Sequence, residues 1–356
     1  MESLLYPMKL KPIFKDKIWG GNKIKTHLGY DYGALANCGE LWSLSGVEGN
    51  ETEIENGFLA ENNLNEVLEI YMGDLIGERN YERFGNEFPI LIKVIDANDN
   101  LSVQVHPDDV LAQERGLGNG KTEMWYVMDA DQNAELIDGF NKDITPEYFQ
   151  KVLESDKLMQ CLNVEKAEKG DVFFIPAGRV HALGKGLLIA EIQQTSDTTY
   201  RIFDYNRTDS QGNSRELHTQ EALAAMDFNA TTNAKTQYEY KKNTTLKIAE
   251  CPYFNTNMIV LNQPLKKDFT SLDSFVIYFC VEGICAIRCL DTIVPMRAGE
   301  CVLVPAVADK VEMFPENDAK LMEIYIDTPD DMKFESKIHD NDIFVSFDQN
   351  MTKETI

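Results

Sequence analysis

One short element occurs twice in this chain and constrains the fold more than any other feature. Residues 170–177 read Gly-Asp-Val-Phe-Phe-Ile-Pro-Ala, and residues 299–306 read Gly-Glu-Cys-Val-Leu-Val-Pro-Ala. In both copies a glycine and an acidic residue precede an apolar strand that ends at Pro-Ala, a pattern typical of a turn followed by a buried strand. Because a repeated element indicates a repeated structural unit, the sequence predicts two related β-barrels in tandem.

The rest of the chain also favours a mainly β fold. Short runs rich in Val, Ile and Phe, bounded by Gly, Asn, Asp or Pro, predict strands over 88–97, 101–106, 123–128, 171–176, 188–193, 246–249, 275–281, 284–289 and 301–305. Helix signals are confined to segments near 63–85, 145–160 and 219–227, where Asn63 with Glu66 resembles a capping box and Pro146 follows Thr145. The polar segment 231–243 reads as a linker. We therefore expect a first domain over 1–235 with a small helical insertion and a second over 236–356.

Composition limits the partners. The 356 residues carry a formal net charge of −25, which disfavours nucleic acids and anionic membranes. An anionic small molecule would need cations placed locally. Seven cysteines without a CxxC pair, and an N-terminus without a basic head and apolar core, predict a cytoplasmic protein without signal peptide, membrane span or disulfides. No heptad pattern indicates the oligomeric state, so monomer and dimer both remain open.

A polar stripe marks the predicted strand over 101–106. Alternate side chains of a strand share a face, so Ser102, Gln104 and His106 point the same way. Glu123 begins the next apolar run, and His181 follows a tight turn forced by Pro176 and Gly178. Buried polar groups need partners, so these side chains are candidates for one site.

These segments resemble the two motifs of the cupin superfamily. Gly170-x5-Pro176-x-Gly178-x2-His181 matches the second motif at its defined positions, except that Lys185 replaces the usual Asn. The first motif departs more, because Gln104 replaces its leading His and Glu123 lies farther along. The resemblance implies the ligand set Gln104, His106, Glu123 and His181. Two imidazoles, a carboxylate and an amide oxygen suit one Zn²⁺.

The alternative is that His106 and His181 are unrelated core histidines. Two histidines in two matched motifs favour the metal. In the second barrel, Lys310 stands where His181 does and Val307 where Gly178 does. That barrel is therefore expected to be metal-free.

A closer resemblance is to the type I mannose-6-phosphate isomerase family, in its short bacterial branch. It rests on Leu101-Ser-Val-Gln-Val-His-Pro, Lys121-Thr-Glu, and Glu191-Ile-Gln-Gln-Thr-Ser-Asp-Thr-Thr-Tyr-Arg201, and covers about the first 210 residues well. It implies that Arg201 is the active-site arginine and that Ser102 and Arg207 bind the substrate phosphate. The family usually has Lys at the position of Arg207 and a cation at the position of Asp109.

The resemblance implies interconversion of mannose 6-phosphate and fructose 6-phosphate by proton transfer between C1 and C2 through an enediol. Zinc would polarise the substrate oxygens, and Arg201 would stabilise the enediolate. Lys121 and Glu191 are both candidate bases. Two rivals remain: an iron-dependent cupin oxygenase, which would not need Gln104, and a non-catalytic sugar-phosphate-binding protein, which would not need Lys121, Glu191 and Arg201.

Overall fold

The computed structural model of the protein describes residues 4–155, 157–208 and 211–329. The fold is mainly β, and all strand pairs within its four sheets are antiparallel. The predicted mainly β class is thereby confirmed.

Two of the sheets come from the N-terminal two thirds of the chain. The six-stranded sheet has the order β10-β7-β12-β5-β3-β2, and the five-stranded sheet has the order β13-β6-β11-β8-β9. Their strands are β2 (Ile13–Lys15), β3 (Glu40–Leu44), β5 (Ile90–Ala97), β6 (Val103–Val105), β7 (Glu123–Ala130), β8 (Glu135–Phe140), β9 (Leu162–Lys166), β10 (Val172–Ile175), β11 (His181–Leu183), β12 (Leu187–Gln194) and β13 (Tyr200–Phe203).

The other two sheets are built mainly from the C-terminal third. The seven-stranded sheet has the order β14-β15-β22-β17-β20-β1-β4, and the four-stranded sheet has the order β16-β21-β18-β19. Their strands are β1 (Met8–Lys11), β4 (Glu53–Ile54), β14 (Thr245–Cys251), β15 (Phe254–Leu261), β16 (Leu265–Asp268), β17 (Val276–Glu282), β18 (Ile284–Cys289), β19 (Thr292–Arg297), β20 (Cys301–Val304), β21 (Lys310–Pro315) and β22 (Ala319–Tyr325). The N-terminal strands β1 and β4 thus complete a sheet made otherwise of C-terminal strands.

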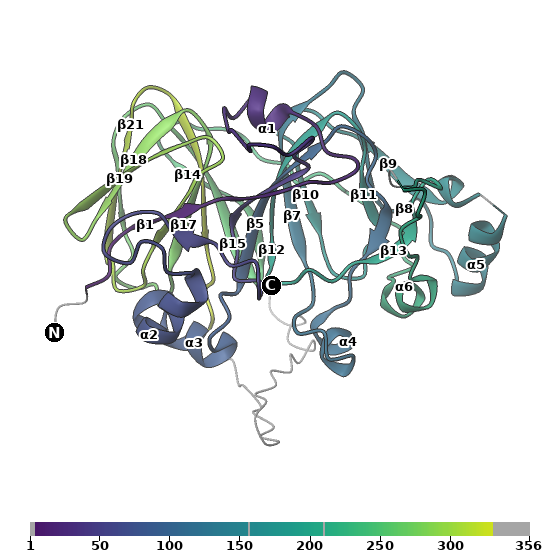
Figure 1. Ribbon diagram of the computed structural model, residues 1–356, viewed down its shortest axis with the longest axis horizontal. Coiled ribbons are helices and arrows are strands. Elements are labelled where there is room, and N and C mark those ends of the chain that lie inside the picture. The colour runs from purple at the N-terminus through teal and green to yellow at the C-terminus, as the bar shows by residue number, and fades with distance from the viewer. Residues whose placement is uncertain (1–3, 156, 209–210, 330–356) are drawn as a thin grey trace, which may run out of the picture.

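The sheets stack as four layers, with the six- and seven-stranded sheets in the middle (Figure 1). The largest apolar core lies between these two, and includes Ile92 of β5, Tyr126 of β7, Phe279 of β17 and Leu303 of β20. Separate cores fill the space between the four- and seven-stranded sheets and between the five- and six-stranded sheets. Each half is therefore a pair of facing sheets with an interior of its own.

The predicted helical segments are also present. They contain α2 (Leu64–Ile76), α3 (Glu78–Phe84), α5 (Pro146–Glu154), a 3₁₀ turn (Leu158–Gln160) and α6 (Thr219–Ala225), while α1 (Lys23–Thr26) and α4 (Asp109–Glu114) are short additions. Asn63 and Glu66 form the full capping box of α2, and the Thr145 side chain caps α5, which has Pro146 in its first turn. Local sequence chemistry thus decides where these helices begin.

Strand pairing repeats between the two halves. β10, β7, β12 and β5 are neighbours in the same order as β20, β17, β22 and β15. The register repeats as well: Trp125 pairs with Phe173 and Glu191, as Tyr278 pairs with Val302 and Glu323. The repeated Gly-acid-strand element that was read from the sequence forms β10 and β20.

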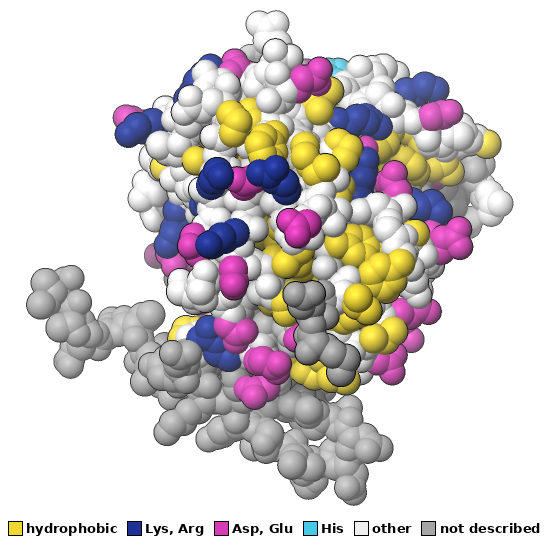
Figure 2. All heavy atoms as spheres, turned by 90° about the vertical axis from the view of Figure 1, so that its left-hand side faces the viewer, with side chains coloured by type: hydrophobic (Ala, Val, Ile, Leu, Met, Phe, Trp, Pro, Cys, Tyr) yellow, Lys and Arg dark blue, Asp and Glu magenta, His cyan; other side chains and the backbone are white. Residues whose placement is uncertain are grey.

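In the described part of the chain, no helix has the length and apolar character needed to cross a membrane. Figure 2 shows apolar side chains gathered on the side where the four-stranded sheet faces solvent. Ile284 of β18 and Ile293 of β19 are about half exposed there.

Candidate metal and substrate site

Three strands of the two N-terminal sheets position the predicted metal ligands: β6 and β11 are neighbours in the five-stranded sheet, and β7 belongs to the six-stranded sheet. Ser102 and His106 flank β6, whose Val103 and Val105 point the other way into the core under α5 and α6. His181 begins β11 and pairs directly with Gln104 of β6. The alternation read from the sequence therefore separates an apolar face from a polar face, as expected.

Glu123 completes a tight group with the two histidines. It begins β7, and its Oε1 lies 3.2 Å from His106 Nε2 while its Oε2 lies 3.8 Å from His181 Nε2. The three potential ligand atoms lie within 4.8 Å of one another, and all three residues are buried. The structure thus brings His106, Glu123 and His181 together from three separate segments.

Hydrogen bonds aim both imidazoles at the same point. His106 Nδ1 lies 2.9 Å from the Thr198 carbonyl oxygen, and His181 Nδ1 lies 2.8 Å from the Arg179 carbonyl oxygen. A carbonyl oxygen can only accept a hydrogen bond, so each Nδ1 must carry the ring proton. Each Nε2 then presents a lone pair, the arrangement in which histidines bind metals. Burial lowers the pKa of His106 to about 3 and also lowers that of His181, so both rings are neutral.

The atoms that face one another lack hydrogen bonds. His106 Nε2, His181 Nε2 and Glu123 Oε1 are buried without a directed hydrogen-bond partner. Burial opposes ionisation of Glu123, but the charge of Lys121, whose Nζ lies 3.0 Å from Oε1, and the two histidines hold its pKa well below the usual range. A buried carboxylate that faces two buried imidazole nitrogens without hydrogen bonds fits a divalent cation such as zinc.

A cavity of about 310 Å³ adjoins this group. The predicted fourth ligand Gln104 and both candidate bases, Lys121 and Glu191, line it. Ser102 and Arg201 line it as well, whereas Arg207 is not among its lining residues. Every predicted catalytic residue therefore faces one space next to the metal ligands.

Glu191 is held in place by two donors. Trp125 Nε1 donates to its Oε2 over 2.9 Å, and Lys93 Nζ lies 3.4 Å from its Oε1. Burial and the nearby Glu123 charge raise the pKa of Glu191, with Lys93 acting in the opposite sense. Lys93 lies inside the strand predicted over 88–97 from its Val, Ile and Phe residues, and no motif in the sequence identifies it.

Three arginines gather at one side of the cavity. Arg201 and Arg215 line it. Arg207 lies behind it, with ion-pair contacts to Asp204 at 2.5 Å and Asp99 at 3.5 Å and a hydrogen bond to the Asn100 carbonyl. Arg215 was not predicted, because it lies in a loop without a motif.

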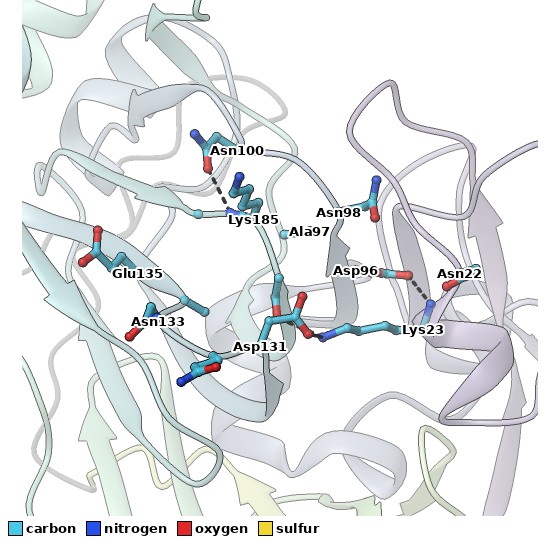
Figure 3. Close-up of a pocket in the computed structure, with 14 residues that line it drawn as sticks. Asn22, Lys23, Asp96, Ala97, Asn98, Asn100, Asp131, Asn133, Glu135 and Lys185 are labelled. Atoms are coloured by element: carbon cyan, nitrogen blue, oxygen red, sulfur yellow. Dashed lines mark hydrogen bonds and ion pairs between the residues drawn. The ribbon is translucent and has the colours of Figure 1, made fainter.

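A larger cavity of about 590 Å³ lies elsewhere and has different chemistry. Figure 3 shows that several of its polar side chains are engaged: Asp96 accepts from the Lys23 backbone over 2.5 Å, Lys23 Nζ contacts Asp131 at 2.9 Å, and Asn100 accepts from the Lys185 backbone. No histidine or cysteine lines it among the described residues. The candidate chemistry is therefore concentrated in the smaller cavity.

Comparison with known proteins shows the family to which this chain is related. The family model described as "Phosphomannose isomerase type I, catalytic domain" matches residues 7–146. Mannose-6-phosphate isomerase ManA of Bacillus subtilis is 33% identical over 305 residues, which span 84% of this chain and 93% of that protein. The chain belongs to the type I phosphomannose isomerase family. The probable mannose-6-phosphate isomerase GmuF of the same organism is 41% identical over 62% of this chain and 68% of its own length.

Solved structures of the family have the same fold. The mannose 6-phosphate isomerase of Bacillus subtilis superposes with a TM-score of 0.79 at 30% identity, covering 90% of this chain and all of that one. A zinc-bound mannose 6-phosphate isomerase gives a TM-score of 0.74 at 18% identity, with 91% of this chain and all of that one covered. The second match is a likeness of fold.

Proposed function

We propose that this chain is a zinc-dependent aldose–ketose isomerase that interconverts mannose 6-phosphate and fructose 6-phosphate. The observation that carries the proposal is the convergence of His106, Glu123 and His181, with buried unbonded atoms, beside a cavity lined by Lys121, Glu191 and Arg201. An oxygenase has no need of this last set, and membership of the phosphomannose isomerase family supports the isomerase.

His106, Glu123 and His181 would hold the zinc, and Gln104 would supply the fourth protein ligand. Bound zinc would act as a Lewis acid toward the substrate oxygens. Gln104 lines the cavity and pairs with His181, which supports its assignment. The Nδ1 bonds to carbonyl oxygens fix the ring orientations before any ion binds.

Proton transfer between C1 and C2 requires a base in the cavity. Lys121 and Glu191 are the two candidates, and both line it. Glu191 has the geometry of a positioned carboxylate, because Trp125 and Lys93 fix it from two sides. Lys121 Nζ lies 3.0 Å from Glu123 Oε1, which places the amine directly beside the proposed metal ligands.

The substrate phosphate would bind at the arginine-rich side. Ser102 and Arg201 line the cavity there, and Arg207 would add its charge from behind. Arg201 would also stabilise negative charge on the enediolate. In a chain with a net charge of −25, this local cluster of cations is what an anionic substrate requires.

We also propose that the two halves are tandem cupin barrels: a catalytic one formed by most of 1–235, and a metal-free one formed by 236–356 together with β1 and β4. The repeated strand order and register support the duplication. Val276 pairs with Val304 as Glu123 pairs with Ile175, so the second copy has valine at the carboxylate ligand's register position. Lys310 of β21 is exposed and its neighbour Val311 is buried, which leaves no imidazole there.

A coupled assay on mannose 6-phosphate tests the function. We expect turnover with zinc-loaded protein, loss of turnover with a chelator and recovery with added zinc. Glu191→Gln and Lys121→Ala should then be compared: loss of the true base lowers kcat strongly and removes one limb of the pH–rate profile. Absence of turnover with zinc fully bound would leave only a binding protein, and oxygen uptake by the iron-loaded protein would indicate the oxygenase.

A further inference from the structure

The segment that carries Arg215 runs beside the strand that carries Arg201. His218 donates its backbone N–H to the Arg201 carbonyl over 2.7 Å, and Arg201 Nη1 donates to the Glu216 carbonyl over 2.9 Å. The Arg201 backbone N–H also donates to His218 Nδ1 over 3.1 Å. These contacts fix the loop against β13, so both arginines line the same side of the cavity.

One buried carboxylate orients two of the three arginines. Asp204 is 5% exposed, and its Oδ2 accepts from Arg215 Nε over 2.8 Å while its Oδ1 accepts from Arg215 Nη2 over 2.5 Å. The same Oδ1 accepts from Arg207 Nη2 over 2.5 Å. A guanidinium that binds a carboxylate along one edge keeps its other N–H groups for a second anion.

The positive charges of the three arginines exceed the negative charge of the buried carboxylate beside them. Arg201, Arg207 and Arg215 share Asp204 as their one buried carboxylate among the described residues. Arg201 Nε is buried without a hydrogen-bond partner. An anion placed between Arg201 and Arg215 would offset the repulsion between the two guanidinium groups.

We propose that Arg215, oriented by Asp204, binds the substrate phosphate together with Arg201. Arg207 then acts through Asp204, as a positioning residue that also adds charge. This inference rests on the proposed function, since it assigns a residue to the phosphate of the same substrate. A purely structural ion pair between Arg215 and Asp204 is the alternative that the experiment must separate.

The experiment compares Arg215→Ala with Arg207→Ala and the wild type, all zinc-loaded. Loss of a charge-assisted hydrogen bond corresponds to roughly a 10- to 100-fold effect. We expect Arg215→Ala to raise KM for mannose 6-phosphate by that factor with little change in kcat, and Arg207→Ala to raise it less. Arg215→Lys should recover part of the affinity. Arg288→Ala, which breaks an exposed ion pair with Glu312 in the other half, is the matched control and should not change KM.

Calorimetry with mannitol 1-phosphate, a substrate-like sugar-alcohol phosphate that cannot isomerise, keeps this test independent of catalysis. We expect Arg215→Ala to weaken its binding while binding of unphosphorylated mannitol stays the same. Unchanged KM and unchanged binding of the phosphate compound in Arg215→Ala would overturn the inference. A different result would refute the proposed function but leave this inference standing. In that case the zinc-loaded wild type shows no turnover but binds the phosphate compound tightly, and Arg215→Ala loses that binding.

Discussion

His106, Glu123 and His181 give up hydrogen bonds that buried groups normally make. A buried polar atom without a partner costs about 1–3 kcal/mol, so the two imidazole nitrogens destabilise the ion-free fold, whereas Lys121 offsets part of the cost at Glu123 Oε1. Their unbonded atoms face one another, and an ion there would offset the whole cost at once. Metal binding at this site should therefore raise the free energy of unfolding.

Gln104 is the ligand assignment that most needs a test. We expect Gln104→Ala to weaken zinc binding by about one to two orders of magnitude, because an amide oxygen is lost while the histidines stay. Competition with a chromophoric chelator measures the affinity. Ser102→Ala is the matched control from the same strand face and should bind zinc as the wild type does. Equal zinc affinity in Gln104→Ala would remove Gln104 from the ligand set.

Asp138 links stability to pH. It pairs with His181 across β8 and β11, is fully buried, and has Oδ2 without a hydrogen bond. Burial raises its pKa to about 6, despite Arg179 Nη1 at 3.1 Å from Oδ1. The folded state thus binds a proton between about pH 6 and pH 4 that the unfolded state does not bind.

This carboxyl should therefore stabilise the fold as the pH drops through 6 and should cost stability above it. We expect Asp138→Asn to abolish that contribution, so that the wild type gains about 2 kcal/mol relative to the variant between pH 7.5 and pH 4.5. Urea unfolding of both proteins across this range measures the difference. A difference that does not vary with pH would contradict the raised pKa.

Side-chain alternation predicted that Ser102, Gln104 and His106 share one strand face, and the ligand set itself came from the resemblance to the cupin motifs. The structure brings His106, Glu123 and His181 of that set together. Lys93 and Arg215 could not be predicted in this way. Lys93 lies in the run 88–97, where apolar neighbours on both faces indicate full burial, and only strand pairing reveals Glu191 beside it. Arg215 depends on a loop that folds back onto β13. Both depend on tertiary pairing, which local patterns do not contain.

At the scale of elements, a carboxylate at the same register position has different hydrogen-bond partners in the two halves. Glu191 pairs with Trp125 and Lys93, and Glu323 pairs with Tyr278 and Asn257. Glu323 accepts from Asn257 over 2.9 Å, from Lys267 over 3.0 Å and from Tyr278 over 3.1 Å. It is therefore fully bonded within the C-terminal half.

We expect Glu323→Ala to lower the free energy of unfolding by about 3–5 kcal/mol, because it leaves the Lys267 charge partly buried without its partner. Urea denaturation of the whole chain measures the loss. Glu250→Ala, which breaks an exposed pair with Lys247, is the control and should cost no more than about 1 kcal/mol. Equal costs for the two variants would contradict a stabilising role of the Glu323 group.

Capping residues and a first-turn proline in the sequence predicted correctly where two helices begin. Asn63 with Glu66, and Thr145 with Pro146, mark where α2 and α5 begin. The turn also repeats between the halves, because Arg179 N–H donates to the Pro176 carbonyl as Ala308 N–H donates to the Pro305 carbonyl. Lys310 therefore holds the position of His181, yet Lys310 is exposed and Val311 is the buried residue. Counting residues alone does not show which face a side chain takes after the turn.

At the scale of the whole molecule, a shared core joins the halves. The six- and seven-stranded sheets pack against each other, and β1 and β4 join the C-terminal strands. Ser43 of β3 also donates to the Gly299 carbonyl over 2.9 Å, before β20. A division of the chain at one point in the sequence does not predict that β1 and β4 join the sheet of the other half.

We expect the protein to unfold in one transition because neither half buries this interface alone. Zinc in about 100-fold excess over its dissociation constant should add roughly 2.7 kcal/mol to the free energy of unfolding. Calorimetry with zinc and with chelator measures both effects. Two separate transitions, of which only one responds to zinc, would indicate independent halves.

The hydrogen-bonded Glu323 has a consequence for any attempt to create a second active centre in this protein. Its oxygens are occupied by an amide, a phenol and an ammonium group, so they have little capacity left to take a proton from a sugar carbon. Engineering would first have to free this carboxylate, and only then replace Val276 and add imidazoles.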